Sequence, residues 1–184
     1  MYYMLECHGP VSPVRVSLRN VPMLDGVSWN SGAMITNPVP SPLRVSISGG
    51  PKDVLVPMFQ VGMLALRDDV IAAMGDAGVD NLQLFDLVIE DPRTQQELLD
   101  YRAVNIVGLV AAADMSKSKA TGGGPLIDVD FESVAIDETK ARELLLFRLA
   151  ECVSGIVVHE RVKRSIERNG ITGLDFVLPG DWGG

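Results

Sequence analysis

Hydrophobic and polar positions are most regularly spaced between Asp68 and Val110, and this stretch predicts the centre of the fold. Four apolar residues at helical spacing form one stripe along Asp68–Ala77. Two aspartates begin this segment, where they oppose the positive end of a helix dipole. We therefore expect a helix over Asp68–Ala77, with Gly78 as its left-handed C-terminal residue and a tight turn through Asn81.

Two strands are predicted to follow that turn. Leu82–Glu90 is largely apolar on both alternating faces, and Asp91-Pro92 stops it. A charged connection follows, in which Thr94–Asp100 has room for a helical turn, and Tyr101–Val110 is then apolar at successive positions. A strand that is apolar on both faces is central and covered on both sides. Asn105 would then be a buried amide that needs hydrogen-bond partners.

The rest of the chain predicts one more long helix and several short strands. Val162 and Ile166 share the inner face of a helix that ends at Gly170, and His159 flanks its N-terminus. Asp114–Pro125 is expected to be a loop, and Asp137–Leu146 has a helical start. The segments that predict strands are Tyr2–Cys7, Val14–Leu18, Leu43–Ile47, Ile127–Phe131, Leu146–Leu149, Gly155–Val158 and Gly173–Leu178. Apolar and polar residues alternate in the second, third and fourth of these.

These elements predict an α+β fold: a mixed, mainly antiparallel sheet with a few helices packed on it. The chain has 184 residues, of which 47% are hydrophobic, enough for one domain with a real core. Several prolines exclude helix from most of the segment between Asn20 and Leu43. We expect residues 1–48 to form a strand-and-loop N-terminal part that wraps the core, residues 49–178 the core, and residues 179–184 a tail.

The net charge of −8 says more about which partners the protein can bind than about its fold. A field of this sign repels nucleic acid and anionic membranes and favours basic partners; simple solubility is the plainer interpretation. The acid is concentrated in one segment, which favours an acidic face. This segment, Asp68–Asp100, has Arg93 as its only lysine or arginine. Its acidic residues are Asp68, Asp69, Asp76, Asp80, Asp86, Glu90, Asp91, Glu97 and Asp100.

The two cysteines, Cys7 and Cys152, are too few for a disulfide framework, so we expect free thiols in a reducing compartment, although a bond between them stays open. The N-terminus lacks the basic and apolar regions of a signal peptide. No apolar run approaches the ~18 residues that span a bilayer. A cytoplasmic protein that does not contact membranes is therefore expected.

Few residue patterns point to catalysis. Asp128-Val129-Asp130 resembles the acidic pair of metal-dependent glycosyl transfer, because alternate strand residues share a face. Glu132 continues the alternation, which favours a solvated face or a partner surface. His8 and His159 lie far apart, Gly122-Gly123-Gly124 lacks the remainder of a phosphate loop, and no nucleophile has an evident base. We expect no catalytic residues, no bound metal and no cofactor.

Several colinear motifs resemble one family. The helix is followed by Val79-Asp80-Asn81 and a strand that reaches Phe85. Tyr101 precedes Val104-Asn105-Ile106-Val107-Gly108, and Asp114 has Ser116 beside it. Phe147-Arg148-Leu149 and, after the last helix, Thr172-Gly173-Leu174-Asp175-Phe176 complete the series. In this order and spacing, from about Trp29 to Phe176, the chain resembles the bacterial polymorphic-toxin immunity proteins of the eleventh immunity family, formerly a domain of unknown function.

Two features depart from that family's pattern. His159 stands where the family often has a capping serine, and the glycine-rich loop at 121–124 is particular to this chain. The resemblance implies a cytosolic antitoxin that binds a cognate toxin and blocks it by occlusion, without chemistry. Toxins of these systems are often nucleases, and a basic nuclease would suit an acidic inhibitor. No direct contact with nucleic acid is expected.

The motif residues are expected to be structural rather than to form the interface. They are Asp80, Asn81, Asn105, Asp114, Ser116, Phe147 and Arg148. Asp80 and Asn81 suit a turn, and Asn105 and Arg148 would be paired inside the core. The interface candidates are the acids expected to be exposed: Asp128, Asp130 and Glu132 first, then Asp86, Glu90 and Asp91.

Two other functions stay open. One is a metal-dependent enzyme that uses the Asp128/Asp130 pair, and the other is a binding or scaffold module with another partner. Convergent carboxylates with strongly shifted pKa values would favour an enzyme, whereas a broad acidic face would favour an inhibitor. Exposed strand edges would also allow a homodimer.

Overall fold

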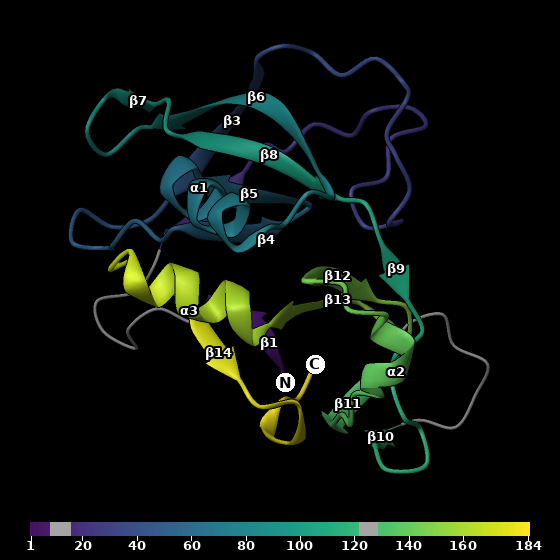
Figure 1. The fold of residues 1–184 in the computed structure, drawn as a ribbon. Coiled ribbons are helices and arrows are strands. Elements are labelled where there is room, and N and C mark those ends of the chain that lie inside the picture. The colour runs from purple at the N-terminus through teal and green to yellow at the C-terminus, as the bar shows by residue number, and fades with distance from the viewer. Residues whose placement is uncertain (8–15, 122–128) are drawn as a thin grey trace.

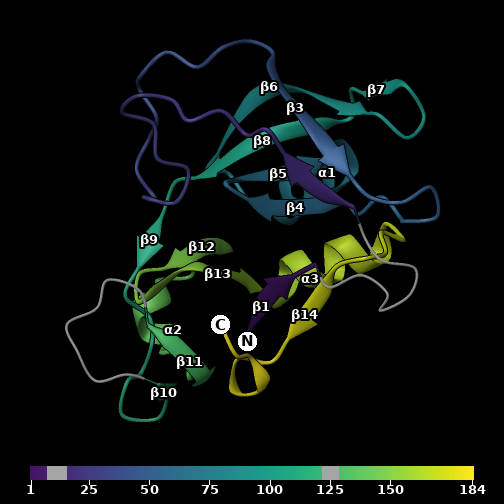
Figure 2. The ribbon, with the colours of Figure 1, turned by 180° about the vertical axis from the view of Figure 1, so that it is seen from behind.

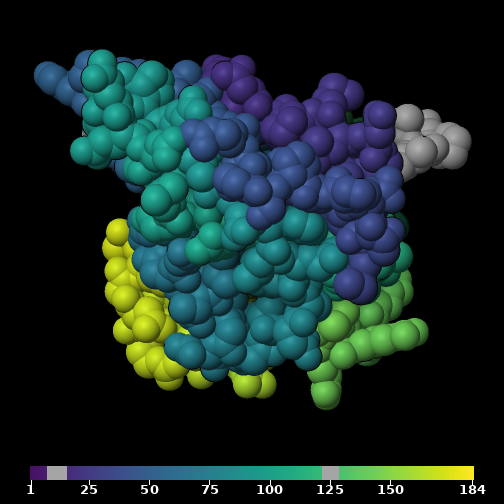
Figure 3. Space-filling model, turned by 90° about the horizontal axis from the view of Figure 1, so that it is seen from above, coloured from purple at the N-terminus to yellow at the C-terminus, as the bar shows by residue number. Residues whose placement is uncertain are grey.

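A computed structural model describes residues 1–7, 16–121 and 129–184, and within these the fold is mixed α+β, as the sequence predicts. Most strand pairs are antiparallel; β3–β6 and β9–β12 are the two parallel pairs among the described strands. Figure 1 shows two layers, with a large sheet above and a smaller sheet below. Seen from above, the purple-to-teal first part of the chain covers almost the whole upper face, and the green and yellow later part shows only at its margins (Figure 3).

The large sheet has the strand order β2-β3-β6-β8-β5-β4, and β7 pairs with the far half of β6. Its two end strands, β2 and β4, also lie near each other, so the sheet curls strongly. Its strands are β2 (Ser17–Arg19), β3 (Leu43–Ser48), β4 (Met58–Val61), β5 (Met63–Arg67), β6 (Leu82–Asp91), β7 (Gln96–Leu98) and β8 (Tyr101–Ile106).

The smaller sheet has the order β14-β1-β13-β12-β9, and a two-stranded ribbon, β10–β11, lies beside it. It joins the two ends of the chain, because β1 pairs with both β13 and β14. The strands are β1 (Tyr2–Glu6), β9 (Leu109–Val110), β10 (Lys119–Thr121), β11 (Asp130–Ser133), β12 (Leu146–Leu149), β13 (Cys152–His159) and β14 (Asp175–Val177).

Helices α1 (Asp68–Ala77) and α3 (Glu160–Arg168) connect the layers. Each packs on the strand that precedes it, α1 on β5 and α3 on β13, and the two helices contact each other (Figure 1). The predicted bounds of α1 are confirmed, and Gly78 follows it with a φ of 98°. Two shorter elements complete the chain: α2 (Glu138–Ala141) and a 3-10 turn, η1 (Pro179–Asp181).

Two hydrophobic clusters lie on opposite faces of the smaller sheet. Alternate residues of β13 divide between them: Ile156 and Val158 face the large sheet and both long helices, whereas Val157 faces away. The second cluster gathers Phe147, Phe131 and Trp182. The smaller sheet is therefore covered on both sides, which explains the apolar runs in β12 and β13.

The predicted strand Tyr101–Val110 is wrong as a single element. β8 ends at Ile106, and after Gly108, whose φ is 154°, β9 joins the other sheet by pairing with β12. Figure 2 shows this connection passing from the upper sheet to the lower one. The apolar segment therefore forms two successive strands, the first in the large sheet and the second in the smaller sheet.

Two other expectations are also corrected. Thr94–Asp100 contains β7 instead of a helical turn, because the chain forms a hairpin with β6. The expected loop Asp114–Pro125 contributes β10, which pairs with β11. β4 and β5, joined through Gly62 with a φ of 72°, are not among the strands that the sequence predicts. Among the described residues, the helices are all too short or too polar to cross a bilayer.

Candidate functional site

The acids Asp86 and Glu90 on β6 are exposed, and neighbouring basic groups already pair with both. Arg102 Nη1 donates to Asp86 Oδ1 over 3.2 Å, and the Ser41 hydroxyl donates to Asp86 Oδ2 over 2.7 Å. Arg44 Nη2 lies 3.1 Å from Glu90 Oε1 and also bonds Glu97. Much of the charge on this face of the large sheet is therefore neutralised locally.

Asp91 was expected to be exposed, and that expectation is wrong. The residue is 2% exposed, and Arg93 binds both of its carboxylate oxygens, with Nε–Oδ1 and Nη2–Oδ2 distances of 2.8 and 2.7 Å. This hydrogen bonding lowers the pKa of Asp91. Arg93 Nη1 also donates to the Asp53 carbonyl, which ties the loop before β4 to the β6–β7 hairpin. Asp91 is thus placed as a structural residue.

Asp130 and Glu132 lie on β11 on either side of Phe131, whose side chain is buried. Both acids are exposed, and neither forms an ion pair with a described residue. Asp128 lies outside the described residues, so its geometry relative to Asp130 is not defined. Within residues 1–7, 16–121 and 129–184, no group of three or more His, Cys, Asp or Glu side chains is arranged to hold a metal ion.

Asp114 and Ser116 close a turn, as expected for structural residues. Asp114 Oδ1 accepts hydrogen bonds from the Ser116 amide and hydroxyl, and Lys117 Nζ lies 2.7 Å from Oδ2. These contacts, led by the one with Lys117, lower the pKa of Asp114 to about 2. The group stabilises the loop that leads to β10.

The motif residues Asn105, Phe147 and Arg148 are fully buried. Asn105 Nδ2 donates to the Ala33 carbonyl and to Gln83 Oε1, each over 2.8 Å. Arg148 Nη1 donates to the Val153 carbonyl over 2.8 Å, but its Nε and Nη2 have no described partner. Burial lowers the pKa of Arg148 to about 10. The expectation that both polar residues are paired in the core is met for Asn105 Nδ2 and only in part for Arg148.

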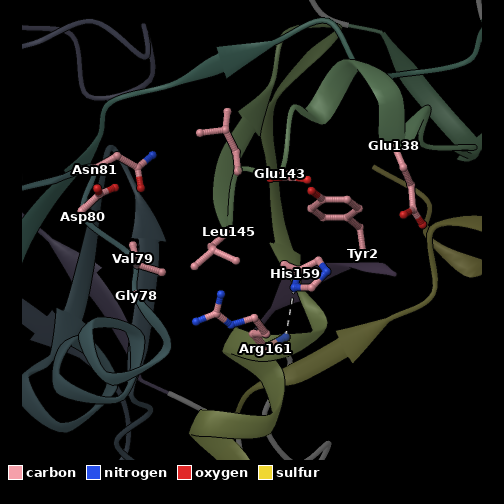
Figure 4. A pocket seen from close by; sticks show the side chains of 11 residues that line it. Tyr2, Gly78, Val79, Asp80, Asn81, Glu138, Glu143, Leu145, His159 and Arg161 are labelled. Carbon is pink, nitrogen blue, oxygen red and sulfur yellow. Dashed lines mark hydrogen bonds between the residues drawn. The ribbon is translucent and has the colours of Figure 1, made fainter.

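Asp80 and Asn81 lie in the turn between α1 and β6, at the edge of a cavity between the two layers. Asn81 Nδ2 donates to the Val107 and Leu146 carbonyls, over 2.9 and 3.0 Å, and so joins the large sheet to β12. The cavity, of about 530 Å³, is hereafter the junction pocket (Figure 4). Its lining residues are Tyr2, Gly78, Val79, Asp80, Asn81, Glu138, Glu143, Leu144, Leu145, His159 and Arg161.

Charged side chains reach the junction pocket from three separate segments. Asp80 follows α1, Glu138 begins α2, and Glu143 lies just beyond α2. Arg161 enters from α3 and extends to the C-terminal end of α1, where a Cβ added to Gly78 would lie 3.5 Å from its Nη2. The negative end of the α1 dipole stabilises a guanidinium at that position.

His159 and Tyr2 form the inner wall of the pocket. His159 caps α3, because its Nδ1 accepts from the Arg161 amide over 3.3 Å, which confirms the predicted flanking role. Its ring meets Tyr2 edge-on with a centroid separation of 5.1 Å. Burial is the main cause that lowers the pKa of His159, so this imidazole favours its neutral form. Burial, with the nearby Glu138 and Glu143, raises the pKa of Tyr2.

Sequence reasoning did not find the pocket, although it named Asp80, Asn81 and His159 individually. Tyr2, Glu138, Glu143 and Arg161 carry no motif that marks them, and only the sheet order brings them together. A second cavity, of about 540 Å³, has Glu6 as its one charged residue among the described lining residues. The junction pocket is the more polar and more highly charged of the two.

Cys7 and Cys152 are both buried and are not joined in a disulfide, so the expectation of thiols is confirmed.

In the comparisons with known proteins, no family model matches this chain and no curated protein is similar to it. The proposed family relation therefore depends on the sequence motifs alone.

Proposed function

We propose that this chain is a non-catalytic immunity protein that binds and neutralises a cognate toxin, with a basic nuclease as the favoured partner. The observation that carries the proposal is the acidic character of the junction pocket. Three carboxylates, Asp80, Glu138 and Glu143, line it against one arginine, on a chain whose net charge is −8. Opposed potentials speed the encounter of two proteins and select the partner.

The carboxylates of the junction pocket also bear on the alternative function, that of an enzyme. The junction pocket does gather several acids, as an active site often does. However, the large displacements of pKa, to about 12 for Tyr101, about 10 for Arg148 and about 2 for Asp114, belong to residues outside this pocket. Burial and turn formation account for these displacements. The pocket therefore supports recognition better than acid–base chemistry.

The mechanism that we propose is occlusion. The toxin docks on the acidic junction between the layers, and the bulk of the inhibitor covers the toxin's active site or nucleic-acid groove. Asp130 and Glu132 on β11 supply further exposed acid that has no described ion-pair partner. These charges would steer the basic partner during encounter, whereas close contacts would hold it afterwards.

The first test is co-purification of this chain with the protein encoded next to it, together with growth of cells that express the neighbour alone. The expected result is a stable complex and a toxicity that this chain relieves. A neighbour that is harmless and does not bind would contradict the proposal for that pair. The same result would favour a binding module with another partner.

A double substitution, Asp128→Asn with Asp130→Asn, separates inhibition from metal-dependent catalysis. In an inhibitor, the variant associates more slowly with its partner, and the difference shrinks as salt is added, because screening removes long-range attraction. In an enzyme that uses this pair, the variant loses affinity for divalent metal, measured by calorimetry. Asp76→Asn, which removes one exposed carboxylate on α1, is the control for the loss of a single acidic charge elsewhere on the surface.

A further inference from the structure

The side chain of Tyr2, a buried residue, lines the junction pocket. Tyr2 is 5% exposed, and its ring is fixed between Phe147 and His159, with centroid separations of 5.8 and 5.1 Å. Its hydroxyl forms no hydrogen bond with a described residue. Figure 4 shows this hydroxyl directed into the pocket, toward Glu143. A phenol held in this way at the wall of a cavity is ready to bond a ligand.

The backbone conformation after α2 places Glu143 in the junction pocket, near Tyr2. Arg142 and Glu143, which follow α2, both have positive φ, 47° and 63°. Such angles are uncommon for residues other than glycine and persist where the surrounding structure enforces them. The turn that results brings the Glu143 carboxylate into the pocket with Tyr2 (Figure 4).

The charges of the lining residues identify the chemistry of the ligand. Asp80 and Glu143 form no ion pair or hydrogen bond with a described residue. Glu138 is partly compensated by the Met1 ammonium, 3.7 Å away, and Arg161 adds one positive charge at the α1 end. With a neutral His159, the described lining side chains carry an excess of negative charge. A cation is therefore the complementary ligand.

We propose that the junction pocket binds one basic side chain of the partner protein, an arginine in preference to a lysine. This inference rests on the proposed function, because it names the anchoring contact of the same complex. A guanidinium is planar and presents several N–H donors, so it can bond the Glu143 carboxylate and the Tyr2 hydroxyl together. It can also lie against the aromatic wall of Tyr2 and His159. The volume of about 530 Å³ lies within the usual range of ligand pockets.

The pocket can be tested without the toxin. N-acetyl-arginine amide is titrated into the isotope-labelled chain, and the amide signals of Gly78 and Leu145 are followed by nuclear magnetic resonance. We expect weak, saturable shifts at these positions, a smaller response to the lysine analogue and none to the neutral norleucine analogue. Equal responses to the arginine and norleucine analogues, or no saturable response, would overturn the proposal.

Three variants attribute that binding to the pocket. Glu143→Gln should weaken it about tenfold, the size expected for the loss of a charge-assisted hydrogen bond. Tyr2→Phe keeps the ring contacts and removes only the hydroxyl, so a smaller loss of about threefold is expected. Glu167→Gln, on the exposed side of α3 and outside the pocket, should change nothing. Unaltered binding by Glu143→Gln would contradict the assignment.

The toxin complex then separates the two proposals. If the chain binds and neutralises its neighbour, Glu143→Gln and Tyr2→Phe should raise the dissociation rate more than the association rate falls, because a buried anchor acts after encounter. A complex with wild-type kinetics in both variants would overturn the arginine anchor and leave the immunity function standing. Binding of the arginine probe, with the expected response to the variants, by a chain that no neighbour recognises would overturn the immunity function instead.

Discussion

At the scale of single residues, Asp91 and Arg93 form the least exposed ion pair between described residues, with side-chain exposures of 2% and 11%. We predict that Arg93→Met lowers the free energy of unfolding by about 3 kcal/mol, because it leaves Asp91 as a buried charge without its partner. The value is at the lower end for such a loss, since Arg93 keeps some contact with solvent. Chemical denaturation monitored by circular dichroism measures the change.

The matched control for this prediction is Arg44→Met. Arg44 also pairs with two acids, but its side chain is 51% exposed, so its loss should change stability little. Equal effects of the two substitutions would show that Asp91 is solvated in solution. The pattern around Asp91-Pro92 predicts only where the strand stops, and it does not indicate that Arg93, two residues later, binds the Asp91 carboxylate.

Tyr101 makes the stability depend on pH in the alkaline range. Its hydroxyl donates to the Val56 carbonyl over 2.8 Å, and burial raises its pKa to about 12 from an ordinary value of 10. Below pH 10 the phenol is neutral in both the folded and the unfolded chain. Between pH 10 and 12 the unfolded phenol releases its proton first, so the free energy of unfolding falls as pH rises, by roughly 2 kcal/mol for this group.

The comparison of wild type with Tyr101→Phe isolates this contribution. The variant lacks the ionisable hydroxyl, so its free energy of unfolding should fall less steeply over the same pH range. The ultraviolet absorbance of tyrosinate in the folded protein gives the titration itself. Parallel pH profiles of the two proteins would show that Tyr101 ionises as easily in the folded chain as in the unfolded chain.

At the scale of elements, the sequence predicts what a local pattern controls. The bounds of α1 follow from its apolar stripe and from Gly78, and the structure confirms them. The division of Tyr101–Val110 into β8 and β9 could not be predicted in this way, because alternation looks the same whichever sheet a strand joins. The change of sheet depends on Gly108, whose amide donates to the Gly32 carbonyl and whose carbonyl accepts from the Arg148 amide.

We predict that Gly108→Ala lowers the free energy of unfolding by about 1–2 kcal/mol. The φ of 154° is unfavourable for alanine, and the added Cβ would lie 3.4 Å from Asn81 Nδ2, which bridges the two sheets. Gly75→Ala in α1 is the control substitution, and it should change stability in the opposite direction. Nothing lies within 4 Å of the Cβ it adds, so better helix propensity should stabilise the protein by about 0.5–1 kcal/mol. Thermal denaturation of both variants measures the difference in sign.

At the scale of the whole molecule, the fold class could be predicted from the sequence, whereas the candidate site could not. Short alternating segments suffice to predict a mainly antiparallel sheet with a few helices. The junction pocket instead combines residues from β1, the α1–β6 turn, α2 and α3. Their proximity depends on the order β1-β13-β12 and on the packing of α1 against α3, which no local pattern specifies.

In the proposed complex with a basic toxin, the net charge and the pocket should act on different steps of binding, and this gives the last prediction. The total charge of −8 acts over a distance and is screened by salt, so added salt should slow association with a basic toxin and leave dissociation nearly unchanged. Asp130→Asn with Glu132→Gln removes exposed charge on β11 and should reproduce part of that slowing. Glu143→Gln should instead speed dissociation, since its carboxylate lies in the pocket.

Stopped-flow association and surface plasmon resonance at several salt concentrations separate these rates. Exposed charges contribute mainly to steering, so the β11 variant and wild type should converge in association rate at high salt, whereas the faster dissociation of Glu143→Gln should persist there. If the β11 variant changed dissociation and the pocket variant changed only association, the two surfaces would have exchanged roles. The partner would then be anchored at the β10–β11 ribbon, and the junction pocket would serve only to attract it.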